Sequence, residues 1–294
     1  MGLRIMVTGA TGTMGQEVVN RLRQAGADFI AVSRSLERLP QGVPGLSLNY
    51  DNFTLLKQAF RGVDVLFFLQ PLSGEMLPQA ENIAKAARAA GVQFILRVSG
   101  LGASANSPYL FQKVQGEVDE ILKDGGVRIC ILRPNIFMQS FISPFGDSLR
   151  QGVLYLPQGE GRTSFLDARD AAEVAEKILL DPWRYDRQSF DLTGERALSN
   201  AEALSLISHQ VQRRVVYVPV TEEVALRNLE KAGADRWSTD LIMSMHRATR
   251  EGQTSLVSES VKEITGHGPR RFEDFCWEKR GEWILRPPPE ISMF

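Results

Sequence analysis

The chain has 294 residues, of which 34 are Lys or Arg and 35 are Asp or Glu, and its formal net charge is −1. Such a balance provides no global field to hold nucleic acid or an anionic membrane, so we expect neither partner. No apolar run approaches the ~18 residues needed to cross a bilayer, and the first residues lack a secretion signal. We expect a cytoplasmic protein, a monomer or a homodimer, whose partner is a hydrophobic small molecule.

Short apolar strands alternate with helical patterns over residues 1–134. Strands are expected at residues 4–7, 29–33, 46–48, 65–69, 94–98 and 128–132. Helices are expected between them, at residues 16–24, 53–60, 74–90 and 109–122. This alternation predicts βαβ units, and therefore an α/β fold with a Rossmann-type, doubly wound parallel sheet covered by helices on both faces.

The rhythm loosens from Asn135, and glycines and prolines punctuate the chain as far as Gly161. Later helices are expected at residues 169–180, 201–211, 222–232 and 239–251, and strands at 189–192 and 214–219. We predict that residues 1–134 form the dinucleotide-binding domain. Residues 135–294 are expected to form mainly a smaller α/β substrate-binding region, with some segments returning to the Rossmann sheet.

A glycine-rich turn joins the first strand to the first helix, with glycines at Gly9, Gly12 and Gly15. Gly9 permits a tight turn, Gly12 lets the backbone approach a pyrophosphate, and Gly15 allows the helix to pack against the strand. The helix N-terminus offers free N–H groups to the phosphates. The turn therefore predicts dinucleotide binding. Further contacts to the cofactor are expected from Thr11, Thr13, Met14, Gln70 and Pro134.

The end of the second strand indicates which dinucleotide is bound. NAD-binding proteins place a carboxylate there to bind the ribose 2′-OH. Asp28 precedes the strand and lies at the wrong end, whereas Ser33 and Arg34 follow it, with Arg38 one turn later. A guanidinium and hydroxyls suit a 2′-phosphate, so we expect NADP (NADPH) rather than NAD.

Lone histidines and cysteines carry little chemistry in this chain. His209, His246 and His267 are far apart and lack ligand spacing, so no metal site is expected. Cys130 and Cys276 lie among apolar residues and are expected to be buried and unpaired.

Several segments, taken together and in this order, resemble the NmrA-like branch of the atypical short-chain dehydrogenase/reductase superfamily. They are VTGATGTMG (residues 7–15), RGVD (61–64), VSG (98–100), LRP (132–134), FLDARD (165–170) and ITGHGPRRFEDF (264–275). The resemblance runs nearly the whole length. It implies the Rossmann fold and NAD(P) binding. The branch contains NADPH-dependent reductases of quinones, triarylmethane dyes and iminium compounds, and also non-catalytic redox-sensing regulators.

The resemblance also implies candidate catalytic residues. Dehydrogenases of the superfamily use a Ser or Thr after the fifth strand, then Tyr and Lys four residues apart on the next helix, where an ammonium can lower the pKa of the phenol. Ser99, Tyr109 and Lys113 match this pattern, and Lys113 is also expected to hold the nicotinamide ribose. The run from Ser99 to Tyr109 is shorter than in extended members, so Tyr109 is alternatively a wall of the pocket and water the proton source.

An apolar segment leaves the sixth strand at the edge where such sheets bind ligands. Its Phe137, Met138 and Phe141, together with Trp237, are predicted to bind a flat aromatic or polycyclic substrate. The leading hypothesis is an NADPH-dependent reductase that transfers hydride to a conjugated C=O, C=N or C=C of such a molecule. The alternatives are a non-catalytic NAD(P)-binding redox sensor and a non-redox or cofactor-assisted enzyme of natural-product biosynthesis.

Overall fold

The computed structural model describes residues 2–284, and a parallel sheet of seven strands forms its centre. The strands are β1 (Arg4–Val7), β2 (Asp28–Val32), β3 (Gly45–Leu46), β4 (Val65–Phe68), β5 (Phe94–Val98), β6 (Arg128–Pro134) and β9 (Ser189–Leu192). Their order is β3-β2-β1-β4-β5-β6-β9, and every neighbouring pair is parallel. The predicted Rossmann-type α/β fold is confirmed. The strand order reverses between β1 and β4, where such sheets open a ligand-binding crevice at their carboxyl ends.

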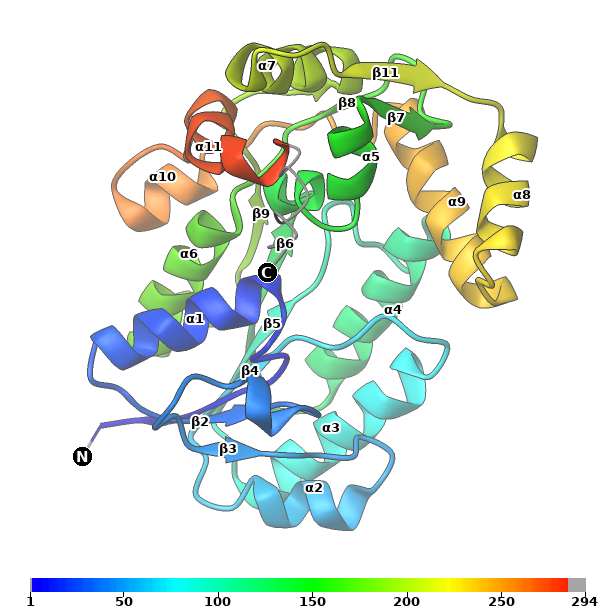
Figure 1. Cartoon of the computed structure of the whole chain (residues 1–294). Helices are drawn as coiled ribbons and strands as arrows, with labels where there is room; N and C mark the ends of the chain where they lie inside the picture. The colour runs from blue at the N-terminus through cyan, green and yellow to red at the C-terminus, as the bar shows by residue number, and fades with distance from the viewer. Residues whose placement is uncertain (1, 285–294) are drawn as a thin grey trace, which may run out of the picture.

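Helices cover both faces of the sheet (Figure 1). One face carries α1 (Thr13–Gln24), α6 (Ala168–Leu180) and α10 (Ser260–Thr265), and the other carries α2 (Phe53–Ala59), α3 (Met76–Ala90) and α4 (Leu110–Asp124). Strand β4 has the sequence VLFF and is buried throughout, because helices cover both of its sides. Within residues 2–284, no helix combines the length and the hydrophobicity that a membrane span requires.

A smaller region lies above the sheet in the view of Figure 1. It contains α5 (Gly146–Gln151), α7 (Asn200–Val211), α8 (Glu222–Lys231), α9 (Arg236–Arg250), α11 (Phe272–Lys279), β7 (Val153–Leu156), β8 (Arg162–Thr163), β10 (Leu198–Ser199) and β11 (Val216–Pro219). Residues such as Phe141, Leu149 and Phe275 give this region a hydrophobic core of its own. Strand β9 and helix α6 also follow residue 134, yet they pack into the Rossmann core.

The structure contains short elements that the sequence pattern did not predict. Strands β8 and β10 have two residues each and pair antiparallel, and α5 and α10 have six residues each. Segments of this length contain too few residues to reveal a hydrophobic period. The prediction for the cysteines is confirmed, since Cys130 and Cys276 are both buried and unpaired.

A largely buried chain of hydrogen bonds links α9 to α7 and predicts a pH effect on stability. Asn200 Nδ2 donates to Gln158 Oε1 (2.7 Å), so Gln158 Nε2 faces His246 Nδ1 (2.9 Å), which must accept as an unprotonated nitrogen. Burial lowers the pKa of His246 from 6.5 to about 4, although the charge of Glu222 opposes this shift.

Because the pKa of His246 is lower in the folded chain than in the unfolded chain, protonation favours unfolding as the pH falls from 6.5 to about 4. We expect the free energy of unfolding to decline over this window, and His246→Leu to flatten that decline. Urea unfolding at a series of pH values measures both. His209→Leu, at an exposed position of α7, is the control and should keep the wild-type slope. An unchanged slope in His246→Leu would contradict the assignment.

Candidate active site

The glycine-rich turn between β1 and α1 has three glycines with different structural demands. Gly9 has a φ of +66°, which favours glycine. A Cβ on Gly15 would lie 2.0 Å from the Gly9 carbonyl oxygen, so Gly15 is required for the close contact of helix and turn. Gly12 has an ordinary φ of −82°, and a Cβ there would meet only Gly9 O, at 3.3 Å. The protein itself therefore makes the weakest demand for glycine at Gly12, which lines an open cleft.

The first turn of α1 is arranged to receive an anion. Gly12 occupies the N-cap position without a side-chain cap, and the first turn contains no acidic residue. The backbone N–H groups of Thr13, Met14 and Gly15 donate no hydrogen bond within residues 2–284. Met14 contributes only its backbone here, because its side chain is buried in the core. Free N–H groups and the positive end of the helix dipole together suit a pyrophosphate.

A cleft of about 930 Å³ opens in front of this turn and extends to the end of β2. Its lining includes Gly9, Thr11, Gly12, Thr13, Gln16, Ser33, Arg34, Arg38, Tyr50 and Gln70. Ser33 Oγ and Thr11 Oγ1 are 3.0 Å apart, which ties the turn to the strand end, and Arg34 is exposed beside them. Asp28 begins β2, opposite Arg4, and is therefore at the other end of the sheet.

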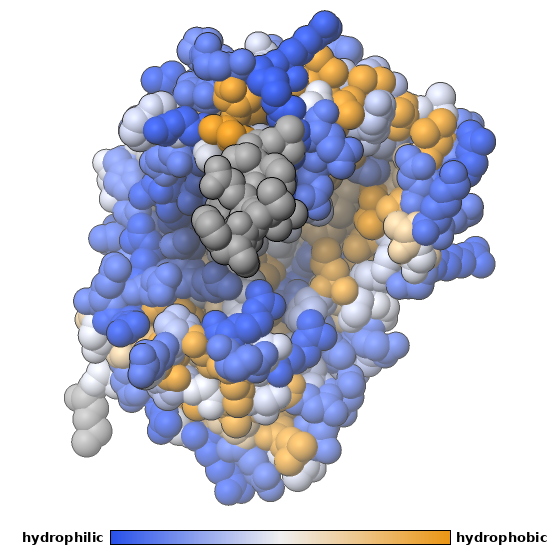
Figure 2. All heavy atoms as spheres, viewed as in Figure 1, coloured by the Kyte–Doolittle hydropathy of each residue, from blue (hydrophilic) through white to orange (hydrophobic). Residues whose placement is uncertain are grey.

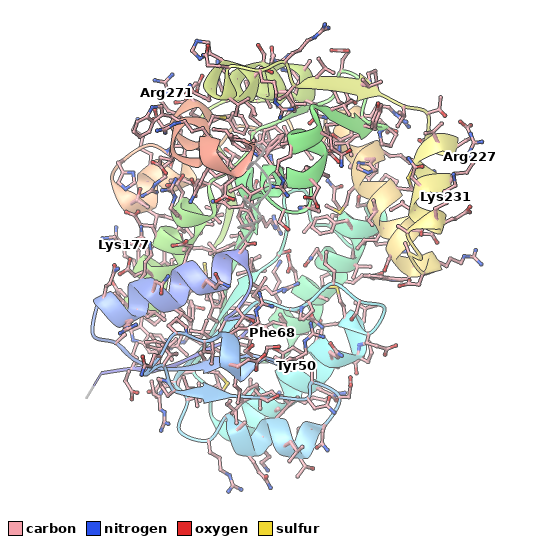
Figure 3. The ribbon with its side chains drawn as sticks, viewed as in Figure 1. Tyr50, Phe68, Lys177, Arg227, Lys231 and Arg271 are labelled. Atoms are coloured by element: carbon pink, nitrogen blue, oxygen red, sulfur yellow. The ribbon has the colours of Figure 1, made fainter. Side chains whose placement is uncertain are left out.

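Tyr50 supplies an aromatic wall of the cleft that the sequence analysis missed. Its ring meets Phe68 edge to face, with the centroids 6.2 Å apart, and both residues are labelled in Figure 3. Tyr50 lies in the loop between β3 and α2, where no periodic pattern points to it. A ring in this position can contact an adenine.

A second, more apolar pocket of about 340 Å³ adjoins the first cleft. The two share Thr13, Leu69, Gln70 and Leu72 as lining residues. The remaining lining comes from Val98, Ser99, Leu101, Phe111, Gln112, Gln115, Pro134, Asn135, Ile136, Phe137, Gln139, Ser140, Ser143, Met245, Ala248 and Thr254. None of these residues is an acid, a base or a tyrosine. On the face drawn in Figure 2, hydrophobic side chains lie inside a hollow between the two parts of the molecule.

Gln70 stands at the junction of the two cavities. Its Nε2 donates to Met76 O (2.9 Å) and to Gln79 Oε1 (3.2 Å), while its Oε1 is buried without a hydrogen-bond partner in residues 2–284. An orphaned buried acceptor is costly unless a ligand satisfies it. The free N–H groups of α1, the space beside Gly12 and this acceptor all fit a dinucleotide that spans both cavities.

Ser99 lines the second pocket, but its proton is directed away from it. Ser99 Oγ donates to Asp119 Oδ2 (2.8 Å), and Asp119 also faces Arg97 (3.5 Å) and Arg133 (3.8 Å). Burial raises the pKa of Asp119, while Arg97 and Ser99 lower it; burial lowers the pKa of Arg97 to about 10, so Arg97 stays charged near neutral pH. Ser99 can therefore accept a hydrogen bond from a ligand more readily than it can donate one.

Tyr109 and Lys113, the predicted catalytic pair, line neither cavity. Tyr109 is the N-cap of α4, and its hydroxyl donates to Glu251 (2.5 Å) beyond the end of α9. Lys113 is exposed, 4.0 Å from Glu117 on the outer side of α4. Tyr109 precedes the first helical residue, Leu110, so only Lys113 of the pair lies on α4, at an exposed position.

The inward side of α4 instead carries Phe111, Gln112 and Gln115 at the pocket, with Asp119 behind them. Sequence analysis missed these residues. The spacing of Gln112, Gln115 and Asp119 at i, i+3 and i+7 is the available signal, because it marks one polar stripe on a helix face.

The four residues predicted to bind the substrate occupy different parts of the structure. Phe137 lines the apolar pocket, whereas Met138 and Phe141 are each 1% exposed and belong to the core of the smaller region. Phe137 is followed by a short turn of 3-10 helix that directs the next side chains inward. Trp237, in the first turn of α9, lies near Gly74, since a Cβ on Gly74 would be 3.8 Å from its indole; Trp237 lines neither cavity.

A Rossmann sheet, an anion-binding turn and an apolar pocket beside it define an oxidoreductase that uses a nicotinamide dinucleotide. The chain belongs to the NmrA-like family, whose family model matches residues 1–265. It is 30% identical over 277 residues to the NAD(P)H azoreductase of Xenophilus azovorans, covering 92% of this chain and 96% of the relative.

Two solved structures share the fold. The NADPH complex of the quinone oxidoreductase QOR2 of Escherichia coli superposes with a TM-score of 0.83 at 23% identity, covering 93% of this chain and 99% of that one. The NADP(H) complex of the triphenylmethane reductase of a Citrobacter species gives a TM-score of 0.81 at 22% identity, covering 95% and 100%.

Proposed function

We propose that this protein is an NADPH-dependent reductase that transfers hydride to a conjugated C=O, C=N or C=C of a hydrophobic aromatic small molecule. The observation that carries the proposal is the continuity of the two cavities, which share the lining residues around Gln70. A dinucleotide with its phosphates at the turn would extend from the polar cleft toward the apolar pocket. The names of the azoreductase and quinone oxidoreductase relatives support this class of reaction.

The residues that would hold the dinucleotide have separate tasks. The N–H groups at the start of α1 bind the pyrophosphate, Gly12 leaves room for it, and Ser33 and Arg34 bind the 2′-phosphate. Gln70 accepts from the nicotinamide end, and Pro134 with Phe137 limits access of water to the apolar pocket. When bound, the reduced nicotinamide supplies a hydride.

Water supplies the proton that the substrate takes up after hydride transfer. No residue that lines the apolar pocket has an acidic or basic side chain, and Tyr109 is engaged with Glu251 outside it. Substrates are therefore expected to be acceptors that tolerate a negatively charged intermediate, such as quinones, rather than isolated ketones.

The test is a screen of NADPH oxidation by the purified wild type against quinones, azo compounds and aliphatic ketones. We expect turnover of conjugated acceptors and none of simple ketones. Tight NADPH binding without turnover of any acceptor would contradict the proposal and favour a redox sensor. Conversion of a substrate without net NADPH consumption would favour the cofactor-assisted enzyme.

Arg34 tests the preference for NADPH. Because Arg34 is exposed at the edge of the cleft, Arg34→Asp should leave the fold intact and replace an attraction for the 2′-phosphate by a repulsion. A charge-assisted pair contributes about 1.5–3 kcal/mol, so NADPH affinity should fall by about 10- to 100-fold while NADH affinity changes little. Calorimetric titration with both cofactors measures this. Arg23→Asp, exposed on α1 outside the cleft, is the control; equal affinity of the wild type for both cofactors would refute the preference.

A further inference from the structure

Gln115 lies between a buried cation and the apolar pocket. It is 4% exposed, and Arg97 on β5 is 0% exposed. Arg97 Nη2 donates to Gln115 Oε1. A guanidinium has no acceptor atom, so the amide oxygen must face Arg97 and the orientation of the carboxamide is fixed. The Gln115 Nε2 group is therefore turned away from Arg97.

The N–H groups of Gln115 are available to a ligand. Nε2 has no hydrogen-bond acceptor within residues 2–284, yet it is not among the enclosed unsatisfied atoms of that part of the chain. Gln115 itself lines the pocket. An amide nitrogen that is open to an apolar pocket gains a hydrogen bond when a ligand brings an acceptor.

Thr13 and Ser143 line the pocket with exposed hydroxyl groups, whereas the more buried polar side chains donate to the protein. Ser99 donates to Asp119, Asn135 to Ser164 and Thr254, Gln139 to Asp167, Ser140 to Phe137, and Gln112 to Leu101 at 3.5 Å. The bonds from Ser99, Asn135, Gln139 and Ser140 are 2.8 Å long, so these donors already have close acceptors within the protein. Gln115 is thus the pocket residue whose amide nitrogen makes no hydrogen bond within residues 2–284 and can donate to a substrate.

We propose that Gln115, held by Arg97, donates a hydrogen bond to the substrate atom that gains negative charge on reduction, and so selects neutral carbonyl acceptors over cationic ones. The inference rests on the proposed reductase function. In the reduction of a quinone, the hydride of the dinucleotide would form an O–H bond at one carbonyl oxygen, which oxidises the dinucleotide, and the displaced electron pair would move through the ring system onto the other carbonyl oxygen. Gln115 stabilises this oxygen, and water then supplies its proton to give the hydroquinone.

The Arg97 charge strengthens this donor. A carboxamide that accepts from a cation through its oxygen donates more strongly through its nitrogen, because hydrogen bonds in a chain polarise one another. Asp119 lies 3.5 Å from Arg97 and balances its charge, while Arg133 also faces Asp119. A cationic substrate gains nothing from a donor of this kind, since reduction leaves it neutral.

The test compares two flat tricyclic acceptors, the neutral 9,10-phenanthrenequinone and the cationic N-methylacridinium, in Gln115→Glu and Gln115→Met. Gln115→Glu keeps an acceptor for Arg97, so the core remains paired, but it removes the donor. Loss of a donor to a developing oxyanion lowers rates by about 10²- to 10³-fold. We expect kcat/KM for the quinone to fall by that factor in Gln115→Glu, and kcat/KM for acridinium to stay constant or rise.

A binding measurement accompanies the kinetics. The affinity of the NADP⁺-loaded protein for phenanthrenequinone, followed by fluorescence quenching, should weaken by about 10-fold in both variants, as expected for one hydrogen bond. Glu120→Gln, exposed on the same helix and outside the pocket, is the control and should keep both the wild-type selectivity and the wild-type affinity.

The possible results distinguish a failure of the role of Gln115 from a failure of the proposed reductase function. An unchanged ratio of the two kcat/KM values in Gln115→Glu, whether both values fall equally or neither falls, would overturn the role of Gln115 in selectivity. A wild type that binds NADPH but reduces neither acceptor would contradict the proposed function instead. In that case the quinone affinities of the variants still decide whether Gln115 donates to a carbonyl, because equal affinities would reject it.

Discussion

Gly12→Val should abolish the binding of NADPH and NADH while leaving the folded structure in place. The isopropyl group would fill the space beside the free N–H groups of Thr13 and Met14, where the pyrophosphate must approach. The fold tolerates the change because Gly12 has an ordinary φ, and its nearest contact, Gly9 O at 3.3 Å from a Cβ, needs to shift by only a few tenths of an ångström.

Circular dichroism and thermal unfolding show whether the variant is folded, and a cofactor titration on the same sample shows whether it binds NADPH or NADH. Gly15→Val is the matched variant, three residues away in the same turn. Its Cβ would lie 2.0 Å from the Gly9 carbonyl oxygen, so we expect a loss of more than about 4 kcal/mol of stability or failure to fold. If Gly12→Val still bound a dinucleotide with wild-type affinity, the turn would be structural only.

Asp119→Ala should destabilise the folded protein by about 3–5 kcal/mol, because it leaves the Arg97 guanidinium without a counter-charge in the core. Arg97 and Asp119 have side-chain exposures of 1% and 2%, and Arg97 Nε and Asp119 Oδ1, 3.5 Å apart, have no other polar partner in residues 2–284. Arg133 faces Asp119 but is 25% exposed, so water can solvate its charge after the change.

Urea unfolding of three variants tests this account. Glu117→Ala removes a more exposed carboxylate from the same helix and should change the free energy of unfolding by less than about 1 kcal/mol. The double variant Arg97→Met/Asp119→Leu replaces both charges by apolar groups and should be more stable than Asp119→Ala alone. A double variant that is less stable than Asp119→Ala would contradict this explanation, because it would show that the unpaired charge of Arg97 is not the main cause of the lost stability.

The fold and the cofactor turn could be predicted from sequence because both depend on local order. Each βαβ unit repeats a strand, a turn and a helix, and hydrophobic periods reveal these elements without knowledge of distant contacts. The glycines of the turn act within seven residues, so their spacing identifies the motif directly. The position of Ser33 and Arg34 at the end of β2 could be predicted in the same way, because both residues come directly after the apolar run of that strand.

Tertiary structure decided which side chains meet in the apolar pocket. Tyr109 and Lys113 have suitable chemistry and spacing, but the packing of α4 against the sheet leaves Lys113 exposed and brings Gln112 and Gln115 to the pocket. Met138 and Phe141 look like pocket residues in sequence, but the chain turns them into the core formed by α7 and α11. The orientation of the Gln115 amide depends on Arg97, 18 residues away on another element. Sequence patterns report what each element buries, whereas the rotation of one element against another depends on the packing of all of them.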